Sequence, residues 1–160
     1  MQLVEGSGKI VFDPKNMTKK HDAQGSWKRS AMLIFGCDMA DYYAWFIMRR
    51  YSIVLQTPIR GAHVTFVNDR ANDMKGGAWE EVKSEWDGLD VKVQFDTDVR
   101  TDGHYWWMRV EPNLTFQKIR RSLGLGDPYF PYHLTIGYPN NKNEHQSHYI
   151  HGLLKKGLTR

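Results

Sequence analysis

The sequence predicts a single α+β domain, and three observations support that prediction. A chain of 160 residues suits one hydrophobic core, whereas two halves would each bury too little surface. Hydrophobic residues make up 41% and aromatic residues 13% of the chain, which excludes a disordered polymer. Segments with apolar residues at every second position alternate with segments of helical spacing, and the strands outnumber the helices. We therefore expect one domain over residues 1–160, in which residues 1–25 are an N-terminal strand and a polar loop.

Three strands and two helices are expected in the first half of the chain. A short strand near Lys9–Phe12 leads into the polar loop, and the apolar run Trp27–Phe35 is a second strand. The third strand, AHVTFV, follows a loop that contains proline and glycine. Asp38 is expected to cap the first helix, and Ala78–Trp86 is expected to be the second. The apolar stripe of the first helix is predicted to contain Met39, Tyr42, Tyr43, Phe46 and Ile47.

The second half is expected to hold a β-hairpin, a helix, a strand and a closing helix. Residues 91–95 alternate apolar and polar side chains, and the polar turn DTDVRTDG leads from them into the strand HYWWMRVE. Because Trp106 and Trp107 are neighbours in that strand, one should face the core and the other should face away from it. A helix begins after Pro112, YHLTIGY is the next strand, and a final helix is expected over 143–156.

The net charge points to a small anionic partner. It is +4, with an isoelectric point near 9.1, and basic residues gather toward the two ends of the chain. A long polynucleotide would usually require a stronger basic surface, whereas a small ligand that carries a phosphate group would not. The alternative, that the basic residues only solvate the surface, is equally compatible with the composition.

Cysteine content and hydropathy indicate a protein of the cytoplasm. Cys37 is the only cysteine, which excludes an internal disulfide framework and a zinc site built on several thiolates. No window approaches the roughly 18 consecutive apolar residues that a membrane-spanning helix needs. The N-terminal segment has neither the basic region nor the apolar region of a secretory signal. We therefore expect a cytoplasmic location and no membrane partner.

One internal repetition carries candidate chemistry. The strands predicted at HVTFV and HLTIG each contain a His-x-Thr triplet, and each follows a helix and a loop with proline and glycine. Side chains alternate across a strand, so His63 and Thr65 share one face while their apolar neighbours take the other. The same holds for His133 and Thr135. If the two strands lie close together, two imidazoles and two hydroxyls converge on one small volume.

Such a set of groups suits phosphodiester chemistry. Because the unperturbed pKa of histidine is about 6.5, one imidazole can act as a general base while the other, protonated, acts as a general acid. The two hydroxyls can donate hydrogen bonds to the non-bridging oxygens of a phosphate, and the scheme requires no metal or other cofactor. The alternative is a pair of half-buried strand histidines whose threonine neighbours simply favour β-structure.

The paired motifs resemble those of the two-histidine phosphoesterase superfamily, which includes LigT-like RNA cyclic phosphodiesterases and viral phosphodiesterases that degrade 2′-5′ oligoadenylates. They stand about 70 residues apart in a small α+β domain, and the resemblance covers about Trp27–Gly157. It implies two pseudo-symmetric lobes of antiparallel strands with flanking helices around a central cleft, with one His-x-Thr strand in each lobe. It also implies catalysis without a metal, in which the two histidines are acid and base and the two threonines hold the phosphate.

Three longer blocks, GAHVTFVND, FPYHLTIGYPN and HQSHYIHGLLKKG, resemble the phage enzymes that counteract CBASS, a bacterial defence that signals with cyclic oligonucleotides. This likeness implies cleavage of 3′-5′ linkages in cyclic di- and trinucleotides by a ribose 2′-OH, through a 2′,3′-cyclic phosphate to linear 3′-phosphate products. Either histidine can be the base in the first step. A phage-encoded protein of this kind would act in the cytoplasm of the bacterial host. The open alternatives are an RNA 2′,3′-cyclic phosphate or 2′-5′ oligoribonucleotide phosphodiesterase, and a non-catalytic module that sequesters nucleotides.

Residues that would bind the nucleotide are expected around the motif strands. Aromatic faces can stack on bases, although packing in the core is the alternative for each aromatic residue. The candidates for substrate binding are Trp27, Arg60, Tyr129, Phe130, Lys142 and Glu144. No metal site is expected, because the histidines at 145, 148 and 151 lack a carboxylate partner. The run Gly6-Ser7-Gly8-Lys9 lacks the spacing of a phosphate-binding loop.

Overall fold

The computed structural model describes residues 1–14, 28–58 and 60–139. Within these ranges the chain has an α+β fold with an eight-stranded antiparallel sheet and three α-helices, and this confirms the predicted class. Most of the predicted polar loop and the final helix predicted at 143–156 lie outside the described residues. No helix in the described part is long and apolar enough to cross a membrane.

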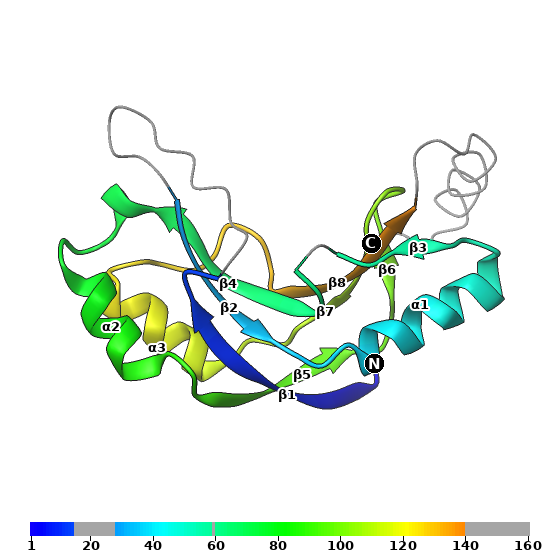
Figure 1. Cartoon of the computed structure of the whole chain (residues 1–160), viewed down its shortest axis with the longest axis horizontal. Coiled ribbons are helices and arrows are strands. Elements are labelled where there is room, and N and C mark those ends of the chain that lie inside the picture. Colours follow the sequence, from blue (N-terminus) through cyan, green and yellow to red (C-terminus); the bar gives the residue numbers. More distant parts are fainter. Residues whose placement is uncertain (15–27, 59, 140–160) are drawn as a thin grey trace.

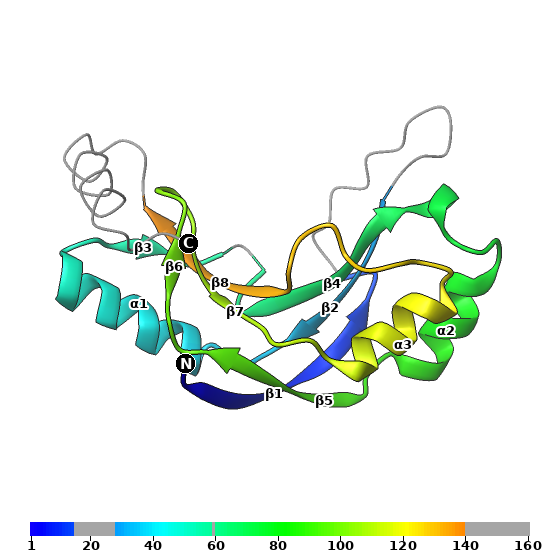
Figure 2. The ribbon, with the colours of Figure 1, turned by 180° about the vertical axis from the view of Figure 1, so that it is seen from behind.

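Helices separate groups of one to three consecutive strands along the described chain, and the strands form one curved sheet (Figure 1). In chain order the elements are β1 (Leu3–Phe12), β2 (Lys28–Ile34), α1 (Asp38–Tyr51), β3 (Leu55–Gln56), β4 (His63–Arg70), η1 (Ala71–Asp73), α2 (Ala78–Trp86), β5 (Asp90–Asp96), β6 (Arg100–Thr101), β7 (Trp106–Arg109), α3 (Leu114–Ser122) and β8 (His133–Pro139). The order across the sheet is β5-β1-β2-β4-β8-β7-β6, and β3 also pairs with β8. The view from behind places α1 toward one end of the sheet and α2 with α3 toward the other (Figure 2).

The N-terminal strand is longer than the predicted Lys9–Phe12 and lies inside the sheet. β1 begins at Leu3 and pairs with β5 on one side and with β2 on the other. A Cβ atom at Gly8 would lie 2.8 Å from the carbonyl oxygen of Ile34, so only glycine fits this close approach. The Gly-Ser-Gly-Lys run is therefore a strand segment that pairs with β5 and, at Gly8, lies close to β2, rather than a loop.

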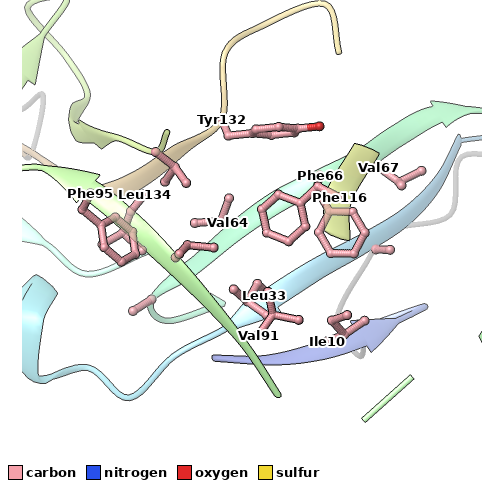
Figure 3. Close-up of a cluster of buried hydrophobic side chains, with 14 of the residues drawn as sticks. Ile10, Leu33, Val64, Phe66, Val67, Val91, Phe95, Phe116, Tyr132 and Leu134 are labelled. Carbon is pink, nitrogen blue, oxygen red and sulfur yellow. The ribbon is translucent and has the colours of Figure 1, made fainter. Parts of the chain in front are cut away.

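The core lies on one side of β4 and β8, and Figure 3 shows its central part. Phe66 of β4 stacks on Phe116 of α3 with the ring centroids 4.4 Å apart and the planes 6° from parallel. Tyr132, just before β8, meets the same Phe116 ring edge-on at 5.2 Å. Removal of a fully buried ring such as Phe66 costs roughly 3–5 kcal/mol of stability. This aromatic group therefore anchors both motif strands to α3.

Helix α1 differs from its prediction in its cap and in its buried face. Its N-cap residue is Cys37, without a side-chain hydrogen bond, and Asp38 is already the first helical residue. The predicted stripe is right for Ile47, which is fully buried, but Tyr42 is 56% exposed and Phe46 is 40% exposed. Because α1 packs mainly against β8, only a narrow stripe of the helix is buried, narrower than helical spacing alone predicts.

Among the remaining described elements, helices α2 and α3 agree with prediction, whereas the hairpin agrees only in part. Helix α2 has the predicted bounds, and α3 begins after an Asn113 cap whose Oδ1 accepts hydrogen bonds from two backbone N–H groups. The predicted hairpin of 91–95 with HYWWMRVE is present only in part. Strand β7 pairs with β6 and β8, and β5 meets this region only through a bridge between Phe95 and Val110. The polar turn DTDVRTDG itself contains β6, because Arg100 and Thr101 pair with the two tryptophans.

Candidate active site

The two His-x-Thr motifs lie on adjacent antiparallel strands. Val64 of β4 is paired with Leu134 of β8. An antiparallel register extends this pairing by one residue on each side, so His63 faces Thr135 and Thr65 faces His133. The Cβ atoms of residues that face each other across such strands are about 4.5–5.5 Å apart. The four side chains therefore form one compact group, with the two histidines on a diagonal.

Burial places all four groups on the same accessible face of the sheet. Along β4 the exposure alternates, with Val64 and Phe66 buried and the histidine and threonine between them half-buried. Along β8, Leu134 and Ile136 are buried, the threonine between them is half-buried, and His133 is exposed. The period-2 pattern predicted for both strands is thus confirmed, and a ligand can reach the face that carries the polar groups.

Each of the two imidazoles is held by the same kind of contact with a backbone carbonyl oxygen. Nδ1 of His63 lies 2.8 Å from the carbonyl oxygen of Gly61, and Nδ1 of His133 lies 3.1 Å from the carbonyl oxygen of Pro131. A carbonyl oxygen can only accept, so each Nδ1 carries a proton and donates it. The Nε2 atom of each neutral ring is then a free base, and it becomes a donor when the ring is protonated.

The surroundings of His63 favour its neutral form. Burial is the main cause that lowers the pKa of His63 below 6.5, while its hydrogen bond to Gly61 acts in the opposite direction. The positive charges of Arg60 and His133 lower this pKa further. The electrostatic coupling between the two rings agrees with their proximity on the sheet. At neutral pH, His63 is therefore suited to accept a proton.

A cavity of about 550 Å³ lies beside the second motif. His133 and Thr135 line one part of it, and Trp107 and Arg109 of β7 line the adjacent part. The register explains this arrangement, because Trp107 faces Thr135 and Arg109 faces His133 across β7 and β8. Phe130, from the loop before β8, also lines the cavity. The cavity thus extends from the second motif toward β6 and β7.

Arg109 was missed by the sequence analysis. Its side chain is exposed, lines the cavity, and has no carboxylate partner among the described residues. Its position next to His133 gives an anionic ligand a positive charge close to the second motif. The alternation in the WWMR strand places Arg109 on the same face as Trp107, but only the pairing of β7 with β8 brings that face to the motif.

The structure places three of the six predicted substrate-binding residues. Phe130 lines the cavity and is 63% exposed, whereas its neighbour Tyr129 does not line it and is 91% exposed. The rings of these two residues meet at right angles with centroids 4.7 Å apart. Arg60 is exposed in the turn before β4, where it acts electrostatically on the first histidine. The remaining candidates, Trp27, Lys142 and Glu144, lie outside the described residues.

The adjacent tryptophans behave as their alternation predicts. Trp106 is buried in the core, and Trp107 on the opposite face lines the cavity. Within the described ranges, no group of three or more His, Cys, Asp or Glu side chains is placed to hold a metal ion.

No family model matches the chain, and neither a curated protein nor a solved structure matches it. The function is therefore argued from the site itself. It contains a pair of imidazoles that both hydrogen-bond to backbone carbonyl groups, two hydroxyls between them, and a neighbouring cavity that the guanidinium of Arg109 lines.

Proposed function

We propose that this protein is a metal-independent phosphodiesterase of the two-histidine superfamily. Its substrates would be cyclic di- and trinucleotide immune signals, so that cleavage of their 3′-5′ linkages counteracts CBASS defence. The observation that carries the proposal is the arrangement of the two motifs, which lie on one face of adjacent strands with both histidines held by the same backbone contact. Two imidazoles whose Nδ1 atoms are held by the backbone can supply, through Nε2, both the base and the acid that this reaction needs.

The organisation of the sheet supports two pseudo-symmetric lobes around the site. Strands β5, β1, β2 and β4 make up one half of the sheet, and β8, β7, β6 and β3 make up the other. The pair Val64–Leu134 joins the halves, and each half contributes one motif strand. Helices α2 and α3 accompany the first half and α1 accompanies the second (Figure 1).

In the first step, Nε2 of His63 accepts the proton of a ribose 2′-OH, and the oxygen attacks the adjacent phosphorus. The lowered pKa of His63 supports its assignment as the base. His133 donates a proton to the departing 5′ oxygen, so the bond from phosphorus to O5′ breaks while the bond to O2′ forms. The product is a 2′,3′-cyclic phosphate on an opened chain.

In the second step, the two histidines exchange roles. His133, now neutral, accepts a proton from water, and the water oxygen attacks the phosphorus of the cyclic phosphate. His63 returns its proton to O2′ as the bond from phosphorus to O2′ breaks. The product is a linear nucleotide with a 3′-phosphate, and both histidines return to their starting protonation states.

The remaining polar groups can stabilise the charge that develops on the phosphate. The hydroxyls of Thr65 and Thr135 lie between the two histidines and can donate to the non-bridging oxygens. Arg109 adds a full positive charge at the second motif. Because the sheet holds these donors in fixed positions, they can stabilise the developing charge without first having to rearrange.

The test compares the wild type with the His63→Ala/His133→Ala double variant. Each is incubated with EDTA and a panel of 3′,3′-cyclic dinucleotides and trinucleotides, and the products are resolved by chromatography and mass. Linear 3′-phosphate products from the wild type alone are the expected result. Cleavage only of 2′,3′-cyclic phosphate ends or 2′-5′ linkages would establish the alternative enzyme on the same scaffold. Binding of the cyclic ligands with full recovery of intact ligand would replace catalysis with sequestration.

A further inference from the structure

The far end of the cavity carries polar groups that the proposed reaction does not use. Arg100 is the first residue of β6, Asp102 follows that strand, and both line the cavity. Trp107 connects this end to the second motif, because it faces Arg100 on one side and Thr135 on the other. Strands β6 and β8 are two strand spacings apart, which is about 10 Å. A nucleotide with its phosphate at the motif can therefore place its base at Arg100 and Asp102.

Asp102 offers a fixed acceptor at this end. Its Oδ1 atom accepts hydrogen bonds from the backbone N–H groups of His104 at 2.9 Å and Tyr105 at 2.8 Å. These bonds fix the carboxylate in the turn, and among the described residues no donor is bound to Oδ2, so its lone pairs can accept from a ligand. An ionised carboxylate can only accept, so it selects ligand edges that carry N–H donors.

Arg100 offers fixed donors beside it. Its Nη2 atom is 3.3 Å from Oδ2 of Asp96, and this carboxylate is itself buried. The Nε atom of Arg100 is buried without a hydrogen-bond partner among the described residues. The guanidinium is thus held in place by one contact and retains further N–H donors.

Aromatic side chains form the walls between these polar groups and the second motif. Tyr105 is 47% exposed and lines the cavity from the hairpin, while Phe130 lines it from the loop before β8. Flat aromatic faces bind bases by stacking, with little preference among the bases. The choice of base therefore falls to the polar groups, Arg100 and Asp102.

We propose that this end of the cavity is a subsite for guanine, which rests on the proposed action on ribonucleotides. The edge of guanine presents O6, N1–H and the N2 amino group in succession. Oδ2 of Asp102 accepts from N1–H and the amino group, and Arg100 donates to O6, as arginine commonly does with guanine. Adenine places an unprotonated N1 in the middle of this edge, where it would face the carboxylate. The subsite therefore discriminates against adenine.

The test measures kcat/KM for 3′,3′-cyclic GMP–AMP and for 3′,3′-cyclic di-AMP. The variant is Asp102→Asn, whose Oδ1 can still accept the two backbone hydrogen bonds while the amide nitrogen replaces the free acceptor with a donor. We expect the wild type to prefer the guanine ligand, and the variant to lower that preference by about tenfold or more. Asp98→Asn is the matched control, since Asp98 is exposed nearby and does not line the cavity.

An unchanged preference in Asp102→Asn, with unchanged thermal unfolding, would overturn the guanine subsite while the phosphodiesterase proposal stands. If the wild type cleaves none of the ligands, calorimetric titration of the His63→Ala/His133→Ala variant, with and without Asp102→Asn, separates the two proposals. A preference for cyclic GMP–AMP that disappears with Asp102→Asn supports the subsite even though the catalytic proposal has failed. Equal binding of both ligands by both proteins overturns the subsite.

Discussion

Val64 faces Leu134 across the junction of β4 and β8, and this buried pair sets the geometry of the candidate site. Neither residue carries chemistry. Their pairing keeps the two His-x-Thr motifs in phase, so that both polar faces point to the same side of the sheet. A slip of one residue would turn the polar face of one strand into the core. The apolar residues of the motifs are therefore as important for the site as the histidines and threonines.

The pH dependence of kcat/KM should have an acidic limb below pH 6.5. His63 must be neutral to accept a proton, and burial together with Arg60 and His133 lowers its pKa from 6.5. Arg60→Gln removes one of the positive charges, so the acidic limb should move to higher pH. Arg49→Gln, a change of the same kind on exposed α1, should leave it in place. If Arg60→Gln leaves the acidic limb in place, a group other than His63 controls the fall of kcat/KM at low pH.

The pH dependence of folding stability should also reflect the protonation of His63. Because the pKa of His63 is lower in the folded state, the unfolded chain binds a proton more readily as the pH falls below 6.5. The contribution of His63 to stability is therefore present above pH 6.5 and is lost as the pH falls through the folded-state pKa. Urea unfolding between pH 5 and 7 measures this, and His63→Gln should lose less stability over that interval than the wild type.

Each motif threonine should contribute mainly to kcat. Thr65→Val and Thr135→Val keep the shape of the side chain and remove the hydroxyl donor from the group of four residues. We expect each to lower kcat by roughly 10²–10³-fold, as the loss of one donor to a developing negative charge does in other enzymes. Thr115→Val on α3 is the matched control and should retain wild-type activity. A rise in KM with unchanged kcat would assign the hydroxyls to ground-state binding instead.

Arg109→Gln should weaken binding of the phosphate-bearing substrate and reduce the salt dependence of that binding. The guanidinium lies across from His133 and has no carboxylate partner among the described residues, so an anionic ligand is its natural partner. Titration at several salt concentrations measures both effects. Identical affinities and salt dependence in wild type and variant would remove Arg109 from the site.

The buried Arg120 should be essential for stability. It is 4% exposed, and its Nη1 atom lies 2.8 Å from Oδ2 of Asp69 and 3.0 Å from the carbonyl oxygen of Phe66. Its Nε atom donates to the carbonyl oxygen of Gly126 at 2.7 Å, so this one side chain ties β4 to the loop that leads to the second motif.

Replacement of Arg120 by Met should therefore lower the free energy of unfolding by roughly 3–5 kcal/mol, because it leaves the half-buried carboxylate of Asp69 and two carbonyl groups without this donor. Chemical denaturation measures the change. Lys92→Gln is the control, since the pair of Lys92 and Glu5 is well exposed and should contribute less than about 1 kcal/mol. Similar losses in the free energy of unfolding for both variants would mean that the hydrogen bonds of Arg120 stabilise the fold no more than an exposed ion pair does.

Local patterns in the sequence determined much of the fold and part of the site. Alternation of apolar and polar residues in HVTFV and HLTIG correctly predicted which side chains are buried, because a strand forces neighbours to opposite faces. The bounds of α2 also followed from local periodicity. These features depend on residues that are close together in the chain.

The tertiary structure alone decided which strands are neighbours. The sequence predicted a hairpin of 91–95 with HYWWMRVE, whereas the WWMR part of that segment lies between β6 and β8, and only Val110 bridges to Phe95. That position brings Arg109 beside His133, and it opens the cavity that reaches Arg100 and Asp102. Pairing between distant strands is set by how whole sheet faces pack against the core and the helices, and no short window of sequence encodes it. The residues of each motif were thus enough to predict its chemistry. The position of both motifs on one face of the sheet depends instead on the register between two strands that are about 70 residues apart.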